Sequence, residues 1–110
     1  MLQQLKDKFL GKVPKDCRRS SRWPSVRAAH LEKNPTCALC GGIEALEVHH
    51  IVPFHIDPAN ELNPANLITL CESKRRGVNC HLGIGHLGNY KRSNPTVRED
   101  VDYLRKRFAA

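Results

Sequence analysis

Four of the five cysteines in this chain could be ligands for one metal ion, although only the first pair has the usual ligand spacing. Cys37 and Cys40 are separated by two residues and followed by glycine, which is the pattern of a metal-binding knuckle. Cys71 and Cys80 are separated by the longer insert ESKRRGVN. A loop at residues 74–77 would still bring both sulfurs together, so we predict a structural zinc ion held by four thiolates. The alternative is that Cys71 is only a buried strand residue and Cys80 takes no part, which leaves the site incomplete.

The cysteine count also bears on the compartment. An odd number of cysteines without an export signal argues against a disulfide framework. The amino terminus, MLQQLKDKFLGK, carries a charge every few residues, and no apolar run approaches the ~18 residues that a membrane span needs. We therefore expect a cytoplasmic protein with no membrane segment and no secretory signal. Cys17 has no partner at ligand spacing, so we interpret it as a free thiol.

The charge balance points to a partner. The chain has 18 Lys+Arg against 11 Asp+Glu, a formal net charge of +7 with histidine neutral. Any single basic run is more often a solvated surface, but several runs with few acids between them favour nucleic acid. A lipid surface is disfavoured because no segment pairs a basic face with a bulky apolar one. The basic residues that we expect to contact DNA are Lys74, Arg75, Arg76, Lys91 and Arg92.

Hydrophobic periodicity and proline positions predict the elements that must hold these residues. The expected order is a mobile basic arm at 1–22, a short helix from Trp23 to Asn34-Pro35, strands at 45–52 and 67–70, and a loop at 54–64 between them. The two strands should pair as a hairpin. A last helix is expected at 95–108, with Asn94 as its cap and Pro95 in its first turn. Its apolar stripe should pack on the rest of one domain at 23–110.

His49 and His50 are adjacent on the first expected strand, so their side chains should point to opposite faces. This pair alone is not diagnostic, but its place in the order CxxCGG, EVHHIVPF, NPANLITLC, CHLGIGHLGN is specific. In this order the chain from Trp23 to Tyr90 resembles the HNH endonuclease family, also called His-Me finger nucleases. The resemblance implies an α+β fold: a small ββα-metal domain with flanking helices, two antiparallel strands and a helix around one divalent cation, beside the structural zinc site.

The resemblance also implies roles for individual residues. His49 and His81 would bind the divalent ion, His50 would be the general base, and Asn66 would orient His50 through a hydrogen bond. His86 lies five residues after His81, and the residue one helical turn after His81 is a glycine that cannot bind metal. His86 is therefore either a displaced ligand or a contact to phosphate.

These expectations together predict a metal-dependent DNA endonuclease, either a monomer or a weak homodimer. It would nick or cleave duplex DNA and leave 5′-phosphate and 3′-hydroxyl ends. The catalytic ion would be Mg²⁺, Mn²⁺ or another divalent transition metal, and imidazole ligands favour the transition metals. The alternative is a zinc-stabilised DNA-binding module without catalysis. His50 together with Asn66 favours the enzyme, because a binding module needs neither a base nor a residue to orient it.

Overall fold

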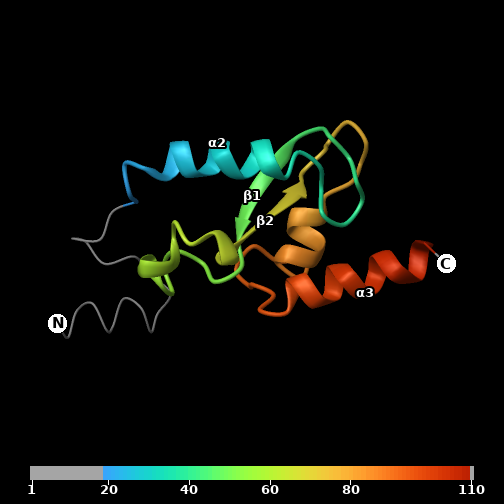
Figure 1. Ribbon diagram of the computed structural model, residues 1–110. Helices are drawn as coiled ribbons and strands as arrows, with labels where there is room; N and C mark the ends of the chain where they lie inside the picture. The colour runs from blue at the N-terminus through green and yellow to red at the C-terminus, as the bar shows by residue number, and fades with distance from the viewer. Residues whose placement is uncertain (1–18, 110) are drawn as a thin grey trace.

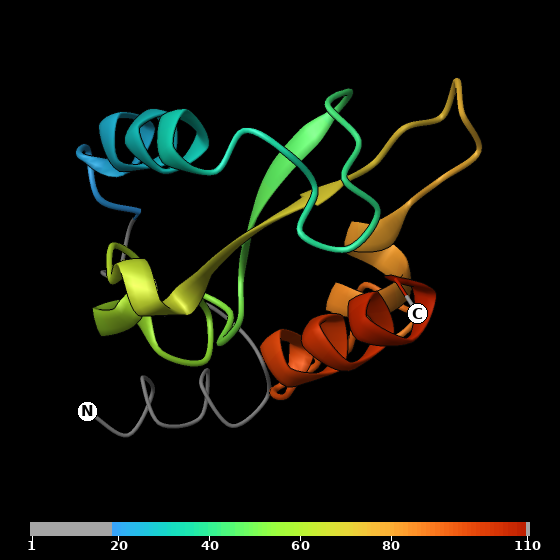
Figure 2. The same cartoon turned by 45° about the vertical axis from the view of Figure 1, so that its right-hand side comes forward.

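The computed structural model describes residues 19–109, so most of the arm predicted at 1–22, including Cys17, lies outside the described residues. The chain forms a small α+β fold, in which helix α2 (Trp23–Lys33) precedes an antiparallel hairpin of β1 (Leu46–His50) and β2 (Leu67–Cys71). A π-helical turn (His81–Gly85) and helix α3 (Val97–Ala109) follow. Helices α2 and α3 lie on either side of the hairpin in both views (Figures 1 and 2). None of the helices in residues 19–109 is long and apolar enough to cross a membrane.

The hairpin is the predicted one, but its first strand is shorter than expected. The register pairs Leu46 with Cys71 and His50 with Leu67, so β1 ends at His50 rather than at Val52. Strand pairing stops there because the side chain of Asn66 accepts a hydrogen bond from the N–H of Val52 and donates one to its C=O. The second strand extends one residue further than predicted and is buried along its whole length.

Both predicted helices are present. Helix α2 ends at Lys33, next to the predicted Asn34-Pro35 boundary, and the backbone N–H of Asn34 closes its last turn on the carbonyl of His30. Helix α3 begins at Val97, two residues later than predicted. Asn94 still acts just before the helix, because its side-chain oxygen accepts hydrogen bonds from the N–H and the hydroxyl of Thr96.

The core is small and contains cysteines. Its buried aliphatic members come from β2, the π-turn and α3, and Val97 and Val101 confirm the predicted apolar stripe of the last helix. Three of the four predicted zinc ligands, Cys37, Cys71 and Cys80, belong to the same cluster. The cysteine site therefore lies inside the core rather than beside it.

Candidate active site and metal centres

The four predicted zinc ligands converge. The sulfur atoms of Cys37, Cys40, Cys71 and Cys80 all lie within 4.8 Å of one another. In the knuckle, Gly41 adopts a φ of 76°, a conformation that glycine tolerates without strain, and its N–H bonds to the carbonyl of Cys37 at 2.9 Å. The four cysteines are thus positioned to form one metal site.

The insert between Cys71 and Cys80 closes as a small hairpin. Ser73 and Val78 form a bridge through two backbone hydrogen bonds, of 2.8 and 3.0 Å, and Gly77 turns the chain with a φ of 66°. This is the loop that the sequence required at residues 74–77, and it brings the two sulfurs together despite their unusual spacing. In Figure 2 it projects beyond the end of β2.

The thiols of this site differ in acidity. Burial raises the pKa of Cys71 and Cys80. Burial also opposes ionisation of Cys40, but hydrogen bonds from the Gly42 N–H and from neighbouring thiols outweigh it and lower its pKa to about 7. Buried thiolates need a cation to compensate their charge, and four sulfurs are the donor set of structural zinc sites.

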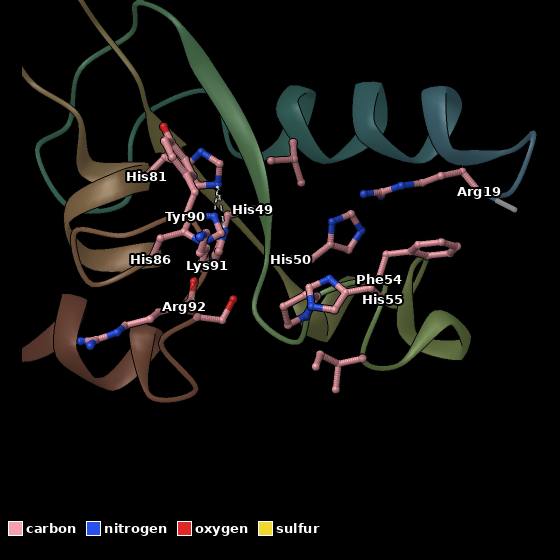
Figure 3. Close-up of a pocket in the computed structure, with 14 residues that line it drawn as sticks. Arg19, His49, His50, Phe54, His55, His81, His86, Tyr90, Lys91 and Arg92 are labelled. Carbon is pink, nitrogen blue, oxygen red and sulfur yellow. Dashed lines mark hydrogen bonds between the residues drawn. The ribbon is translucent and has the colours of Figure 1, made fainter. Parts of the chain in front are cut away.

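A second cluster brings three imidazoles together. Nε2 of His81 lies 3.0 Å from Nδ1 of His49 and 3.1 Å from Nε2 of His86 (Figure 3). The π-turn explains the position of His86. The backbone N–H of His86 bonds to the carbonyl of His81, five residues earlier. In this π-turn the fifth residue after His81 therefore lies where an α-helix would place the fourth. Of the two roles open to His86, this geometry favours the ligand.

Hydrogen bonds at the outer nitrogens fix the tautomers of two of these rings. Nδ1 of His81 donates to the carboxylate of Glu72 at 2.5 Å, and Nδ1 of His86 donates to the carbonyl of Arg92 at 2.7 Å. Neutral His81 and His86 therefore carry no proton on Nε2. Two lone pairs that face each other at 3.1 Å repel unless a cation lies between them, so the donor set fits a divalent ion.

His49 completes this group from β1. Its side chain is buried, and burial together with the nearby imidazoles of His81, His86 and His50 lowers its pKa to about 3. It is therefore neutral at physiological pH and can offer a lone pair. Gly85 makes room for the ring, because a Cβ at this position would lie 3.3 Å from two of its atoms.

His50 lies at the end of β1, apart from the three clustered rings (Figure 3). Its Nε2 donates to the carbonyl of Glu61 at 2.9 Å, which leaves the lone pair of the neutral ring on Nδ1. The ring packs against Trp23, with centroids 4.5 Å apart. Burial lowers the pKa of His50, the carbonyl bond opposes this, and the charge of Arg19 adds to the lowering.

The predicted hydrogen bond between Asn66 and His50 is not found in residues 19–109. Asn66 is buried and instead bonds to the backbone of Val52, as donor and acceptor, and donates to the carbonyl of Asn60 at 3.2 Å. These bonds join the two ends of the loop that carries Glu61. Asn66 therefore acts on His50 only indirectly, by holding the loop whose carbonyl fixes its tautomer.

One cavity of about 880 Å³ is lined by His49, His50, His81 and His86, and also by His55. Lys91 and Arg92, two of the predicted DNA contacts, line it too, and so does Arg19. The other three predicted contacts, Lys74, Arg75 and Arg76, stand on the insert hairpin and are not among its lining residues.

Two residues of the insert hairpin have partners within the fold. Arg75 forms an ion pair with Glu44. The guanidinium of Arg76 lies directly over Gly42, where a side chain would clash with it. The Arg75 side chain is still 79% exposed in this pair, so the role of both residues as DNA contacts stays a prediction.

Two residues at the site were not recognised from the sequence. The Glu72 carboxylate accepts a hydrogen bond from His81. Glu72 was overlooked because it lies in the insert ESKRRGVN, which is mainly basic. Arg19 was one member of a basic run, but its side chain packs over the ring of Phe54 and pairs at 3.6 Å with the buried carboxylate of Glu61. The position of Glu72 directly after Cys71 is the signal that could have found it.

A comparison with protein families gives the same assignment: the model of the HNH endonuclease family matches residues 36–86. The chain carries an HNH domain. The matched segment contains the four cysteines and the three clustered histidines, as well as His50 and Asn66. No curated protein and no solved structure matches the chain.

The cysteine site of the HNH domain can be tested by removing one sulfur. Cys37 has no exposed surface and lies in the core. We expect the parent protein to contain zinc and Cys37→Ser to lose it and become unfolded or protease-sensitive. Zinc content by atomic emission, measured beside limited proteolysis, checks this. Cys17→Ser is the control and should keep both zinc and resistance. A Cys37→Ser protein with full zinc content would exclude Cys37 as a ligand.

The histidine site can be tested through its glycine. In Gly85→Ala the new Cβ would lie 3.1 Å from Leu70 and 3.3 Å from His49, so these neighbours must shift and ion affinity should fall. Gly83→Ala, in the same π-turn, meets nothing within 4 Å and is the matched control. Titration calorimetry with Ni²⁺ measures both. Equal affinities would show that the packing of His49 against Gly85 does not matter for binding.

Proposed function

We propose that this protein is a metal-dependent endonuclease that hydrolyses phosphodiester bonds of DNA. It would nick or cleave duplex DNA and leave 5′-phosphate and 3′-hydroxyl ends. One observation carries the proposal: three imidazoles converge on one point, and a fourth with an available lone pair, His50, lines the same cavity. The HNH domain supports nuclease activity at the level of the family.

The two clusters suit two different ions. Four thiolates fill every position of tetrahedral Zn²⁺, so the cysteine site would be structural. His49, His81 and His86 supply only three donors and leave positions for phosphate and water. They would hold Mg²⁺, Mn²⁺ or another divalent transition metal, and imidazole nitrogen favours the transition metals. An ion bound there would supply positive charge that stabilises the reacting phosphodiester.

His50 is the residue proposed as the general base. Its Nδ1 would accept the proton of the attacking water, while Nε2 keeps its own proton through the bond to Glu61. Because burial lowers the pKa of His50 below its usual 6.5, the basic form is already dominant at neutral pH. Water activation should therefore be lost only as the pH falls through this lowered pKa.

The surroundings of the cavity suit an anionic polymer. Lys91 and Arg92 stand at its edge beside His86, and Arg19 approaches from the side of His50 (Figure 3). Positive side chains thus flank both the proposed ion site and the proposed base. We propose that these three residues contact the phosphates next to the scissile bond, and that Lys74, Arg75 and Arg76 on the insert hairpin make peripheral contacts.

Removing the proposed base separates catalysis from binding. His50→Ala should keep zinc content, folding and affinity for duplex DNA, while the nicking rate of supercoiled plasmid falls by at least ~10²-fold. His55→Ala is the matched control, because His55 lines the same cavity but stands on the loop after β1. It should stay within a few-fold of the parent. If His50→Ala nicks as fast as the parent, His50 is not the base and the DNA-binding module becomes the better description.

A further inference from the structure

Glu72 connects the two clusters. One oxygen of its carboxylate accepts a hydrogen bond from Nδ1 of His81 at 2.5 Å and another from the hydroxyl of Tyr90 at 2.8 Å. Its own backbone N–H is held by the carbonyl of Ala45 at 2.8 Å. The carboxylate is thus fixed from its main chain and from both of its partners.

The chain order explains why this pair meets. Glu72 directly follows Cys71, and His81 directly follows Cys80. The sulfurs of these two cysteines lie in one cluster, and the insert hairpin closes between them. The cysteine site therefore fixes the distance between the Glu72 carboxylate and the His81 imidazole, because each residue directly follows one of the cysteines.

Tyr90 closes the other side of this arrangement. Its ring centroid lies 5.1 Å from that of His86 and 6.0 Å from that of His81 (Figure 3). Its hydroxyl donates to the same carboxylate oxygen that accepts the hydrogen bond from His81, and so helps to hold the carboxylate in place. Figure 3 shows Tyr90 beside His81 and His86 at the edge of the cavity.

We propose that Glu72 is a positioning residue that sets the affinity of the histidine site for its ion. The carboxylate accepts a hydrogen bond from the Nδ1–H of His81 and thereby holds this ring in one tautomer and one orientation. The Nε2 lone pair of His81 then faces His49 and His86. A carboxylate at this place also makes the far nitrogen a stronger donor to metal. The inference rests on the proposed function, because it takes the three histidines to be an ion site.

The test measures ion binding rather than cleavage. Zinc-containing parent, Glu72→Ala and Glu72→Gln proteins are titrated with Ni²⁺ in a calorimeter, and zinc content and thermal unfolding are measured for each. Glu72→Ala should weaken Ni²⁺ binding by 10–100-fold, the usual loss on removing such a partner. Glu72→Gln should lose less, because its amide oxygen still accepts the Nδ1 proton without the charge. Both variants should keep the parental zinc content.

The control is Glu44→Ala. Glu44 lies against the same insert hairpin, where it pairs with Arg75 and Ser73, and it should leave Ni²⁺ affinity unchanged. His81→Ala identifies the site, because it should abolish the measured binding. Equal Ni²⁺ affinity in Glu72→Ala and Glu44→Ala would overturn the inference. Loss of zinc from Glu72→Gln would also overturn it, because Glu72 would then support the cysteine site.

Failure of the inference is distinguishable from failure of the proposed function. If the parent does not nick DNA but its Ni²⁺ affinity depends on Glu72, the nuclease proposal fails and the positioning role stands. If the parent nicks DNA and Ni²⁺ affinity is the same without Glu72, the reverse holds. If the parent binds no Ni²⁺ through His81, the inference is wrong.

Discussion

The convergence of four cysteine sulfurs is the constraint on which the rest of this fold depends. It joins the knuckle at residues 37–40, the end of β2 and the start of the π-turn. Besides the cysteines, β2 adds Ile68 and Leu70 to the same core, and the π-turn adds Ile84. Two of the cysteines, Cys71 and Cys80, directly precede Glu72 and His81 in the sequence. A change in the distance between these two cysteines would therefore displace the His81 ring, which faces His49 and His86. A metal ion bound by the four sulfurs would take the place of apolar packing that a chain this small cannot supply.

Patterns that are local in sequence predicted the fold well. The hairpin, both helices and the grouping of the cysteines follow from periodicity, proline positions and ligand spacing. Two details of the site, the role left open for His86 and the partners of Asn66, depend on backbone geometry that such patterns do not encode. His86 could not be placed because a repeat of 3.6 residues puts a glycine at the ligand position, whereas the π-turn moves the ligand to i+5. The partners of Asn66 lie in a loop whose path is set by long-range contacts.

The distribution of charge shows why net charge alone does not locate an interface. Some basic side chains bond to other parts of the fold: Arg98 donates to the carbonyls of Ala65 and Leu67, and the exposed Arg75 pairs with Glu44. Lys91 and Arg92 line the cavity instead, although the sequence ranked them equally with the insert. Only the fold distinguishes cations that donate to backbone carbonyls from those that line the cavity.

The central claim is that an ion at the three histidines enables hydrolysis of DNA. The most direct measurement is nicking of supercoiled plasmid by protein that has been treated with a chelator mild enough to leave its zinc content unchanged. The account predicts no nicking in the chelator, recovery on addition of Mn²⁺, and nicks that DNA ligase seals without end repair. Nicking that persists in the chelator, or none with Mn²⁺, Mg²⁺ or Ni²⁺, would contradict it.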